Sequence, residues 1–197
     1  MTPVATYEHI IDELANRDYV VVDGLIESEI LFDLRAELIK KHAGEALQRA
    51  EIGNGANRTI NDLIRSDKIS WIDKDSRVPC EQAYYRAVLA FSTYLNRACF
   101  TGISDFEFHY ACYERGTFYQ KHVDRFKNDA KRKFSFITYL NDTWQYGDGG
   151  ELKLHLEDKV IEVQPIFGNT VIFKSHLIEH EVVENNMVRY SVTGWLK

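Results

Sequence analysis

The chain has 197 residues, a formal net charge of −6 at pH 7 and an apolar content of 45%. This length favours one domain, and this composition is typical of a soluble globular protein and excludes intrinsic disorder. The acidic balance argues against broad binding to nucleic-acid phosphates, which requires a basic surface. No apolar run approaches about 18 residues, so we expect no membrane span.

The N-terminal region and the cysteines indicate where the protein resides. Glu8, Asp12 and Glu13 interrupt the first segment, which therefore lacks the apolar core of a secretory signal. The three cysteines, at positions 80, 99 and 112, are odd in number and widely spaced. Reduced thiols in a cytoplasmic protein are the simplest interpretation.

The first half of the chain is predicted to be mainly helical. Apolar residues recur at helical spacing in three segments, which are 7–17, a helix beginning at Ser28, and 81–100. Thr6 is a candidate N-cap for the first of these helices. A short β-rich run over 19–25 separates the first two helices.

The second half is predicted to be β-structure. Six segments have strand composition, and these are 106–114, 134–141, 151–156, 160–164, 170–174 and 189–196. Polar turns separate them, and the charged loop 125–131 is long enough to cover the mouth of a site. Many short strands after a helical region predict an α+β domain built on a β-sandwich or barrel. We expect a helical support region with short strands over 1–100 and a β region over 101–197, packed as one unit.

Two motifs of the form His-x-acid compete for a metal-binding role. His122 and Asp124 are two residues apart, which on a strand would point both side chains to one side. His155 and Glu157 have the same spacing, so the motif alone does not decide. His180 from a distant strand would complete two histidines and one carboxylate, the triad that binds Fe(II) and leaves coordination positions open. The histidines at 9, 42 and 109 are interpreted as structural.

Arg189 is the second candidate functional residue. Strand alternation places it on one face with Thr193 and Trp195. A charged side chain beside a tryptophan needs an anionic partner, and a guanidinium binds a carboxylate through two parallel hydrogen bonds. The partner is either a ligand carboxylate or, in a structural salt bridge, Glu181 or Glu184.

The order and spacing of several segments resemble a known family. The segments are ACYERGTFYQKHVD over 111–124, ITYLN over 137–141, the Gly149-Gly150 pair, and HEV over 180–182 with Arg189 nine residues beyond His180. Together they resemble the prolyl-hydroxylase branch of the 2-oxoglutarate oxygenases, particularly the hypoxia-inducible-factor prolyl hydroxylases and their bacterial relatives. Residues 64–72 extend the resemblance, with Ser66 where that family usually has glycine, so that it covers about residues 58–197.

The resemblance implies a double-stranded β-helix (jelly-roll) core with N-terminal helices packed on one sheet. It also implies roles for individual residues. The implied iron ligands are His122, Asp124 and His180; the implied 2-oxoglutarate contacts are Arg189 and Tyr139; the implied pocket-lining residues are Tyr113, Thr193 and Trp195; and the implied substrate rim is Arg65, Asp67 and Trp71.

The resemblance further implies hydroxylation of a prolyl residue in a protein or peptide, coupled to decarboxylation of 2-oxoglutarate to succinate and CO2. Fe(II), 2-oxoglutarate and O2 are then required, with ascorbate as a supporting reductant. In bacterial relatives the expected target is a translation factor of the elongation-factor Tu type.

Other substrates and a loss of activity remain as alternatives. The first alternative is the same chemistry on a free amino acid, a small peptide or alkylated nucleic acid. The second is a non-catalytic jelly-roll binding module. Alkylation-repair dioxygenases share the spacing of Tyr113 and Gly116 but usually carry a second arginine where this chain has Trp195. Retention of the triad and of Arg189 argues against the module.

Overall fold

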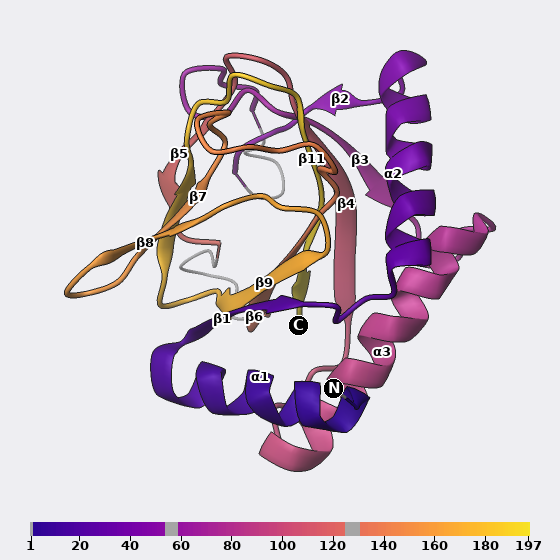
Figure 1. The fold of residues 1–197 in the computed structure, drawn as a ribbon, viewed down its shortest axis with the longest axis vertical. Helices are drawn as coiled ribbons and strands as arrows, with labels where there is room; N and C mark the ends of the chain where they lie inside the picture. The colour runs from indigo at the N-terminus through magenta and orange to yellow at the C-terminus, as the bar shows by residue number, and fades with distance from the viewer. Residues whose placement is uncertain (1, 54–58, 125–130) are drawn as a thin grey trace.

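The computed structural model describes residues 2–53, 59–124 and 131–197 (Figure 1). The helices are α1 (Pro3–Arg17), α2 (Ser28–Ala43) and α3 (Pro79–Cys99), and the strands are β1 (Tyr19–Asp23), β2 (Gln48–Arg49), β3 (Lys68–Ile72), β4 (Phe106–Tyr113), β5 (Tyr119–His122), β6 (Phe134–Tyr139), β7 (Leu152–His155), β8 (Val160–Val163), β9 (Asn169–Lys174), β10 (Glu179–Val182) and β11 (Arg189–Leu196). Nearly all of the predicted charged loop 125–131 lies outside the described residues. Within the described ranges, none of the helices has the length and apolar content needed to cross a bilayer.

The helix boundaries differ from the expected ones at two N-termini. Helix α1 begins at Pro3, because the Thr2 hydroxyl accepts a hydrogen bond from the Ala5 amide and Pro3 occupies the first helical position. Thr6 was therefore wrongly predicted as the cap; its hydroxyl donates to the Thr2 carbonyl inside the first turn. Helix α3 likewise begins earlier than predicted, at Pro79, whereas α2 begins at Ser28 as expected.

Two antiparallel sheets face each other and form the jelly roll. The larger sheet has the order β1-β9-β6-β11-β4-β3-β2 and the smaller one β5-β10-β7-β8. In Figure 1 the strands β5, β7 and β8 lie on one side of β4 and β11, while α2 and α3 lie on the other side. The fold is thus α+β with a double-stranded β-helix core and helices on the outer face of one sheet, as predicted.

Side-chain alternation divides the core into two layers. On the outer face of the larger sheet, Phe108, Phe136 and Val192 pack with apolar residues of the helices. On its inner face, Ile137 and Tyr139 pack against residues of the smaller sheet. Residues at odd positions of β4, β6 and β11 therefore point between the sheets, where the candidate site lies.

Gly194 fits a position in β11 that has no room for a side chain. A Cβ atom there would overlap the Glu107 carbonyl oxygen and the buried Phe108 ring of β4. We expect Gly194→Ala to lower the free energy of unfolding by about 1–3 kcal/mol, since overpacking a tight core forces the backbone to shift. Urea unfolding of both proteins measures the change. An unaltered midpoint would show that β4 and β11 accommodate the added methyl group without loss of stability.

Candidate metal centre and pocket

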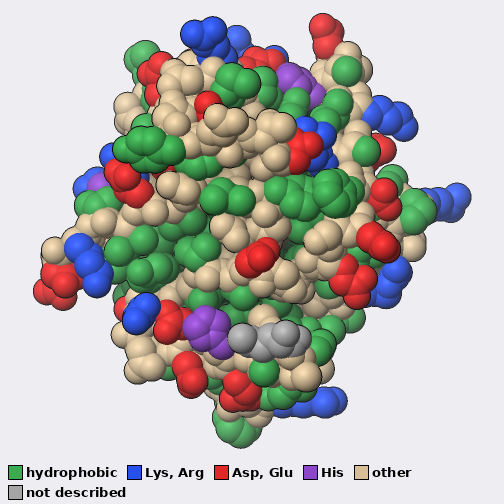
Figure 2. Space-filling model, viewed as in Figure 1, with side chains coloured by type: hydrophobic (Ala, Val, Ile, Leu, Met, Phe, Trp, Pro, Cys, Tyr) green, Lys and Arg blue, Asp and Glu red, His purple; other side chains and the backbone are tan. Residues whose placement is uncertain are grey.

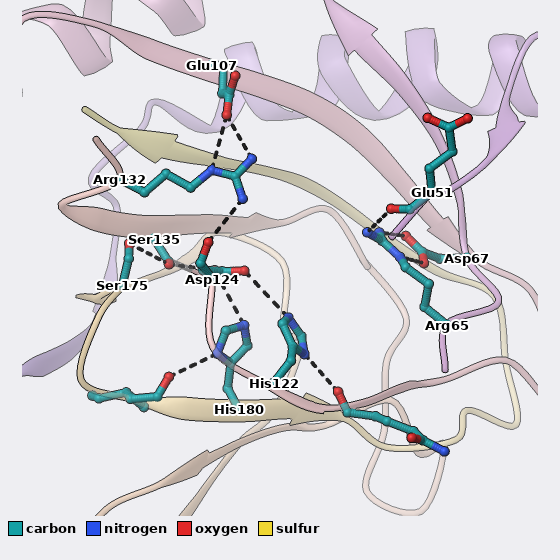
Figure 3. A network of polar contacts seen from close by, with 12 residues as sticks. Glu51, Arg65, Asp67, Glu107, His122, Asp124, Arg132, Ser135, Ser175 and His180 are labelled. Atoms are coloured by element: carbon teal, nitrogen blue, oxygen red, sulfur yellow. Dashed lines mark hydrogen bonds and ion pairs between the residues drawn. The ribbon is translucent and has the colours of Figure 1, made fainter. Parts of the chain in front are cut away.

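Two histidines and one carboxylate converge between the sheets (Figure 3). Each of His122, Asp124 and His180 offers a ligand atom, and these atoms lie within 4.8 Å of one another. The Nε2 atoms of His122 and His180 are 3.5 and 3.4 Å from the Asp124 carboxylate oxygens. No other group of this kind occurs in the part of the chain that the structure describes.

The competing motif does not assemble. His155 lies on β7, and its Nε2 is 3.0 Å from the carboxylate of Glu181 on the neighbouring strand β10. Glu157 is exposed in the turn that follows β7. The structure therefore brings His122 and Asp124 together with His180, and it does not bring His155 and Glu157 into a comparable cluster.

Short strands place the two histidines of this cluster, whereas the carboxylate lies outside them. His122 ends β5 and is paired in register with His180 of β10. Asp124 lies two residues beyond the end of β5, so the expectation that it projects from the same strand as His122 is wrong. Its carboxylate is instead held from the larger sheet, where the Ser135 hydroxyl donates to Oδ2 at 2.6 Å.

The protonation states suit a divalent cation. The Nδ1 atoms of His122 and His180 lie 2.7 and 3.2 Å from main-chain carbonyl oxygens, which only accept, so each Nδ1 carries the proton. The Nε2 lone pairs then point toward Asp124. Burial lowers the pKa of His180 to about 4, against the opposing charge of Asp124. Burial alone would raise the pKa of Asp124, but His180, His122 and Ser135 hold it far below its usual range.

A cavity of about 880 Å³ adjoins this cluster, and Arg189 lies in its wall. The Arg189 side chain is buried, its guanidinium carbon is 4.9 and 5.0 Å from the ring centroids of Tyr113 and Tyr139, and its Nε has no hydrogen-bond partner among the described residues. The buried Tyr139 hydroxyl interacts electrostatically with Arg189 but has no hydrogen bond of normal geometry among the described residues. No carboxylate of the described chain forms an ion pair with Arg189, so the structural salt bridge with Glu181 or Glu184 is absent from these residues.

This end of the cavity has the chemistry of a carboxylate site. A buried cation beside an unsatisfied hydroxyl is costly unless an anion binds. Gly150 contributes space, because a Cβ atom there would lie 3.0 Å from the Cδ of Arg189. The residues present therefore fit a metal ion at the His-Asp-His cluster and a carboxylate ligand at Arg189, in the same cavity.

Another part of the cavity wall is aromatic, and it includes a histidine that was not predicted to line a pocket. His109 was interpreted as structural, yet it lines the cavity between Trp71 and Trp195, with ring centroids 4.9 and 5.6 Å away. Thr193 faces it across the β4–β11 pairing. Alternation along β4 is the signal that was available, since His109 is four residues from Tyr113 and on the same strand face.

The predicted rim residues have different environments. Arg65 donates to both carboxylate oxygens of Asp67, at 2.8 and 2.7 Å, and Asp67 is fully buried. The Arg65 guanidinium lies 4.3 Å from the Tyr119 ring, which stacks on His122 at 3.6 Å. Trp71 is 50% exposed at the mouth of the cavity. Tyr119 was not predicted as a site residue, although its ring stacks on that of His122, a predicted iron ligand.

The environment of His109 predicts acid sensitivity. Burial lowers its pKa from 6.5 to about 3, so between these values the unfolded chain binds a proton that the folded chain does not. The free energy of unfolding therefore falls as the pH is lowered through this window. We expect His109→Leu to recover about 2–3 kcal/mol of the loss between pH 7 and pH 4, measured by urea unfolding of the metal-free protein. Parallel curves for the two proteins would contradict this.

Comparison with known proteins agrees with the site. The sequence model of the 2OG-Fe(II) oxygenase superfamily matches residues 108–197. A Pseudomonas putida prolyl-4-hydroxylase is 32% identical, with 98% of each chain covered and a TM-score of 0.88. A Trichoplax adhaerens prolyl hydroxylase, solved with a hypoxia-inducible-factor peptide fragment, is 24% identical, with 98% of this chain and 90% of that chain covered and a TM-score of 0.89.

The chain belongs to the 2OG-Fe(II) oxygenase superfamily and is a 2-oxoglutarate-dependent dioxygenase. Its cofactor is Fe(II), and its cosubstrates are 2-oxoglutarate and O2. Within the superfamily it falls in the prolyl-4-hydroxylase-like branch, which agrees with the resemblance found in the sequence.

Proposed function

We propose that this dioxygenase hydroxylates a prolyl residue presented by a protein or peptide. The observation that carries the proposal is the similarity to the Pseudomonas putida prolyl-4-hydroxylase, which extends over 98% of both chains. The cavity supports it, because it opens beside the half-exposed Trp71 and the apolar residues Ile60 and Ile64. An aromatic face next to aliphatic side chains suits the ring of a proline.

The proposed roles follow from the geometry of the site. His122, Asp124 and His180 hold the iron, with both imidazoles binding through Nε2. Arg189 binds the C5 carboxylate of 2-oxoglutarate through its guanidinium fork, and the Tyr139 hydroxyl donates to the same carboxylate. When bound, the iron and its cosubstrate supply the oxidising power, with succinate and CO2 as the by-products.

The remaining predicted residues shape the walls. Tyr113 lies against Arg189 and fixes the cosubstrate end, whereas Thr193 and Trp195 line the wall nearer the metal. Trp71 is proposed to contact the prolyl segment. The pair formed by Arg65 and the buried Asp67 supports that rim through Tyr119 and does not bind substrate with the carboxylate.

The surface is consistent with a protein substrate. On the face shown in Figure 2, basic and acidic side chains are interspersed, and no continuous basic area is seen on that face. This face therefore lacks the positive field that steers nucleic acids toward an enzyme. A translation factor of the elongation-factor Tu type, suggested by the sequence resemblance, is the first candidate to test.

The decisive experiment incubates purified protein with Fe(II), 2-oxoglutarate, O2 and that translation factor, with and without ascorbate. We expect succinate to form and one prolyl peptide to gain the mass of one oxygen atom, as measured by mass spectrometry. Succinate formation with a modified free amino acid or nucleobase, and no modified prolyl peptide in whole-cell extract, would reject the substrate class. Absence of both turnover and metal-dependent 2-oxoglutarate binding would favour the non-catalytic module.

A further inference from the structure

The Asp124 carboxylate is anchored by a chain of two buried serines (Figure 3). Ser135 on β6 donates to Oδ2 of Asp124 at 2.6 Å, and the hydroxyl oxygens of Ser135 and Ser175 are 2.9 Å apart. Both serines are fully buried. Neither was singled out from the sequence.

The number of protons available on the three side chains fixes the direction of these hydrogen bonds. An ionised carboxylate only accepts, so the single hydroxyl proton of Ser135 is directed to Asp124. In the second contact Ser175 must therefore donate to Ser135. A donor that itself accepts a hydrogen bond is polarised and becomes stronger, so Ser175 reinforces the bond to the carboxylate.

The backbone around Asp124 explains why this anchor matters. Asp124 lies beyond the end of β5, so strand pairing does not hold it in place. Ser135 is paired in register with Trp195 of β11 and Phe173 of β9, which makes it a rigid position in the larger sheet. Ser175 is tied to the same sheet, because its amide donates to the Lys133 carbonyl at 3.0 Å.

Arg132 holds the main chain of Asp124 from the same side. It donates to the Asp124 carbonyl at 3.2 Å and to the Glu107 carboxylate at 2.9 Å, and its guanidinium lies 3.4 Å from the Trp195 ring centroid. The carbonyl contact fixes the backbone but leaves the carboxylate free to rotate about its own bonds. Oδ1 and Oδ2 of Asp124 lie 3.5 and 3.4 Å from the Nε2 atoms of His122 and His180. Among the described residues outside this triad, Ser135 is the one that hydrogen-bonds the carboxylate, and it does so at Oδ2.

We propose that Ser135, oriented by Ser175, is a positioning residue that keeps Asp124 a one-oxygen ligand of the metal. Because Oδ2 already accepts the Ser135 hydroxyl, Oδ1 would be the oxygen left to bind a metal ion. A carboxylate that binds with both oxygens would occupy a position that the cosubstrates need. The inference rests on the proposed metal-binding role of Asp124, but it does not depend on the identity of the substrate.

The test measures metal affinity, so it does not require turnover. Metal-free wild type, Ser135→Ala and Ser175→Ala are titrated with Co(II), whose visible spectrum reports its coordination, and then with 2-oxoglutarate by calorimetry. We expect Ser135→Ala to bind Co(II) about 10–100-fold more weakly, the range typical for lost partners of metal ligands. Ser175→Ala should bind Co(II) about threefold more weakly, since it retains the direct hydrogen bond from Ser135 to Asp124.

Two further variants separate positioning from packing. Ser92→Ala makes the same chemical change at a buried serine in α3 and should leave Co(II) binding unchanged. Ser135→Thr keeps the hydroxyl and should restore most of the affinity and the wild-type Co(II) spectrum. If Ser135→Ala does not fold, as judged by circular dichroism, Ser175→Ala and Ser135→Thr provide the comparison.

The outcomes distinguish the two proposals. Co(II) affinity of Ser135→Ala or, where that variant does not fold, of Ser175→Ala within a factor of 1.5 of wild type (about 0.2 kcal/mol) would overturn the positioning role. Wild-type protein that binds no Co(II) would overturn both the role and the metal site. Weakened Co(II) binding in the serine variants, together with no prolyl hydroxylation by wild type, would support the role and reject only the proposed substrate.

Discussion

Replacing His180 with alanine is expected to abolish iron binding and 2-oxoglutarate turnover together. His180 is one of the three proposed metal ligands among the described residues, and its Nε2 points at the cluster because its Nδ1 is committed to the Ile178 carbonyl. Removing a direct ligand should cost more than the 10–100-fold lost with an outer partner, so we expect metal affinity to fall by more than about 100-fold. Calorimetric metal titration and succinate assays measure the two effects.

The neighbouring His155 offers a matched control. It lies on β7 beside β10, and it bonds Glu181 instead of facing the cluster. His155→Ala should therefore leave metal affinity and succinate formation close to wild type. Loss of metal binding in His155→Ala, with retention in His180→Ala, would move the metal centre to the other motif.

Replacing Arg189 with alanine is expected to raise the KM for 2-oxoglutarate at least about 30-fold, while metal affinity stays within a few-fold of wild type. Removing one partner of a buried, hydrogen-bonded charge pair costs about 2 kcal/mol of binding free energy or more. A loss of that size corresponds to about 30-fold in affinity for 2-oxoglutarate. Succinate formation at varied 2-oxoglutarate concentration gives the KM, and calorimetry gives the metal affinity.

Two controls define what the guanidinium contributes. Arg189→Lys keeps the positive charge but loses the planar guanidinium that can donate two parallel hydrogen bonds. We therefore expect a KM between those of wild type and Arg189→Ala. Arg35→Ala removes an arginine that pairs with Asp142 outside the cavity and should not alter the KM. If Arg189→Ala shows an unchanged KM, Arg189 does not bind the cosubstrate.

The long strands, and the sheet face to which each of their side chains points, could be predicted from the sequence. The segments that became β4, β6 and β11 alternate over six to eight residues, which is enough to assign one face to Arg189, Thr193 and Trp195. The six strand ranges predicted from composition did not include β5 or β10, although the metal-site hypothesis assumed that His122 and His180 lie on strands. Each of these two strands has only four residues and little local pattern of its own. Strand β5 is held by its pairing with β10, and β10 is held between β5 and β7.

The parts of the site that stayed hidden depend on contacts between distant residues. Asp124 lies beyond the end of the strand on which it was expected. Only the folded chain shows that Ser135 hydrogen-bonds its carboxylate and Arg132 its carbonyl. Serine has no periodic pattern that marks it as a partner of a metal ligand. His109 lies on the strand face that alternation along β4 predicts, whereas Tyr119 stacks on His122 although the two are three residues apart, where regular alternation would place them on opposite faces. The pairing of β5 with β10 is irregular here, which only the folded chain shows.

The metal centre bridges two sheets, with the histidines on the smaller sheet and the carboxylate tethered to the larger one. A bound ion therefore works as a reversible cross-link that favours the closed sandwich over any state in which the sheets separate. Through mass action, a free-ion concentration of 100 times the dissociation constant adds about 2.7 kcal/mol to the stability. The lifetime of such an enzyme in the cell then depends on iron supply, since a chain that opens more often is degraded sooner.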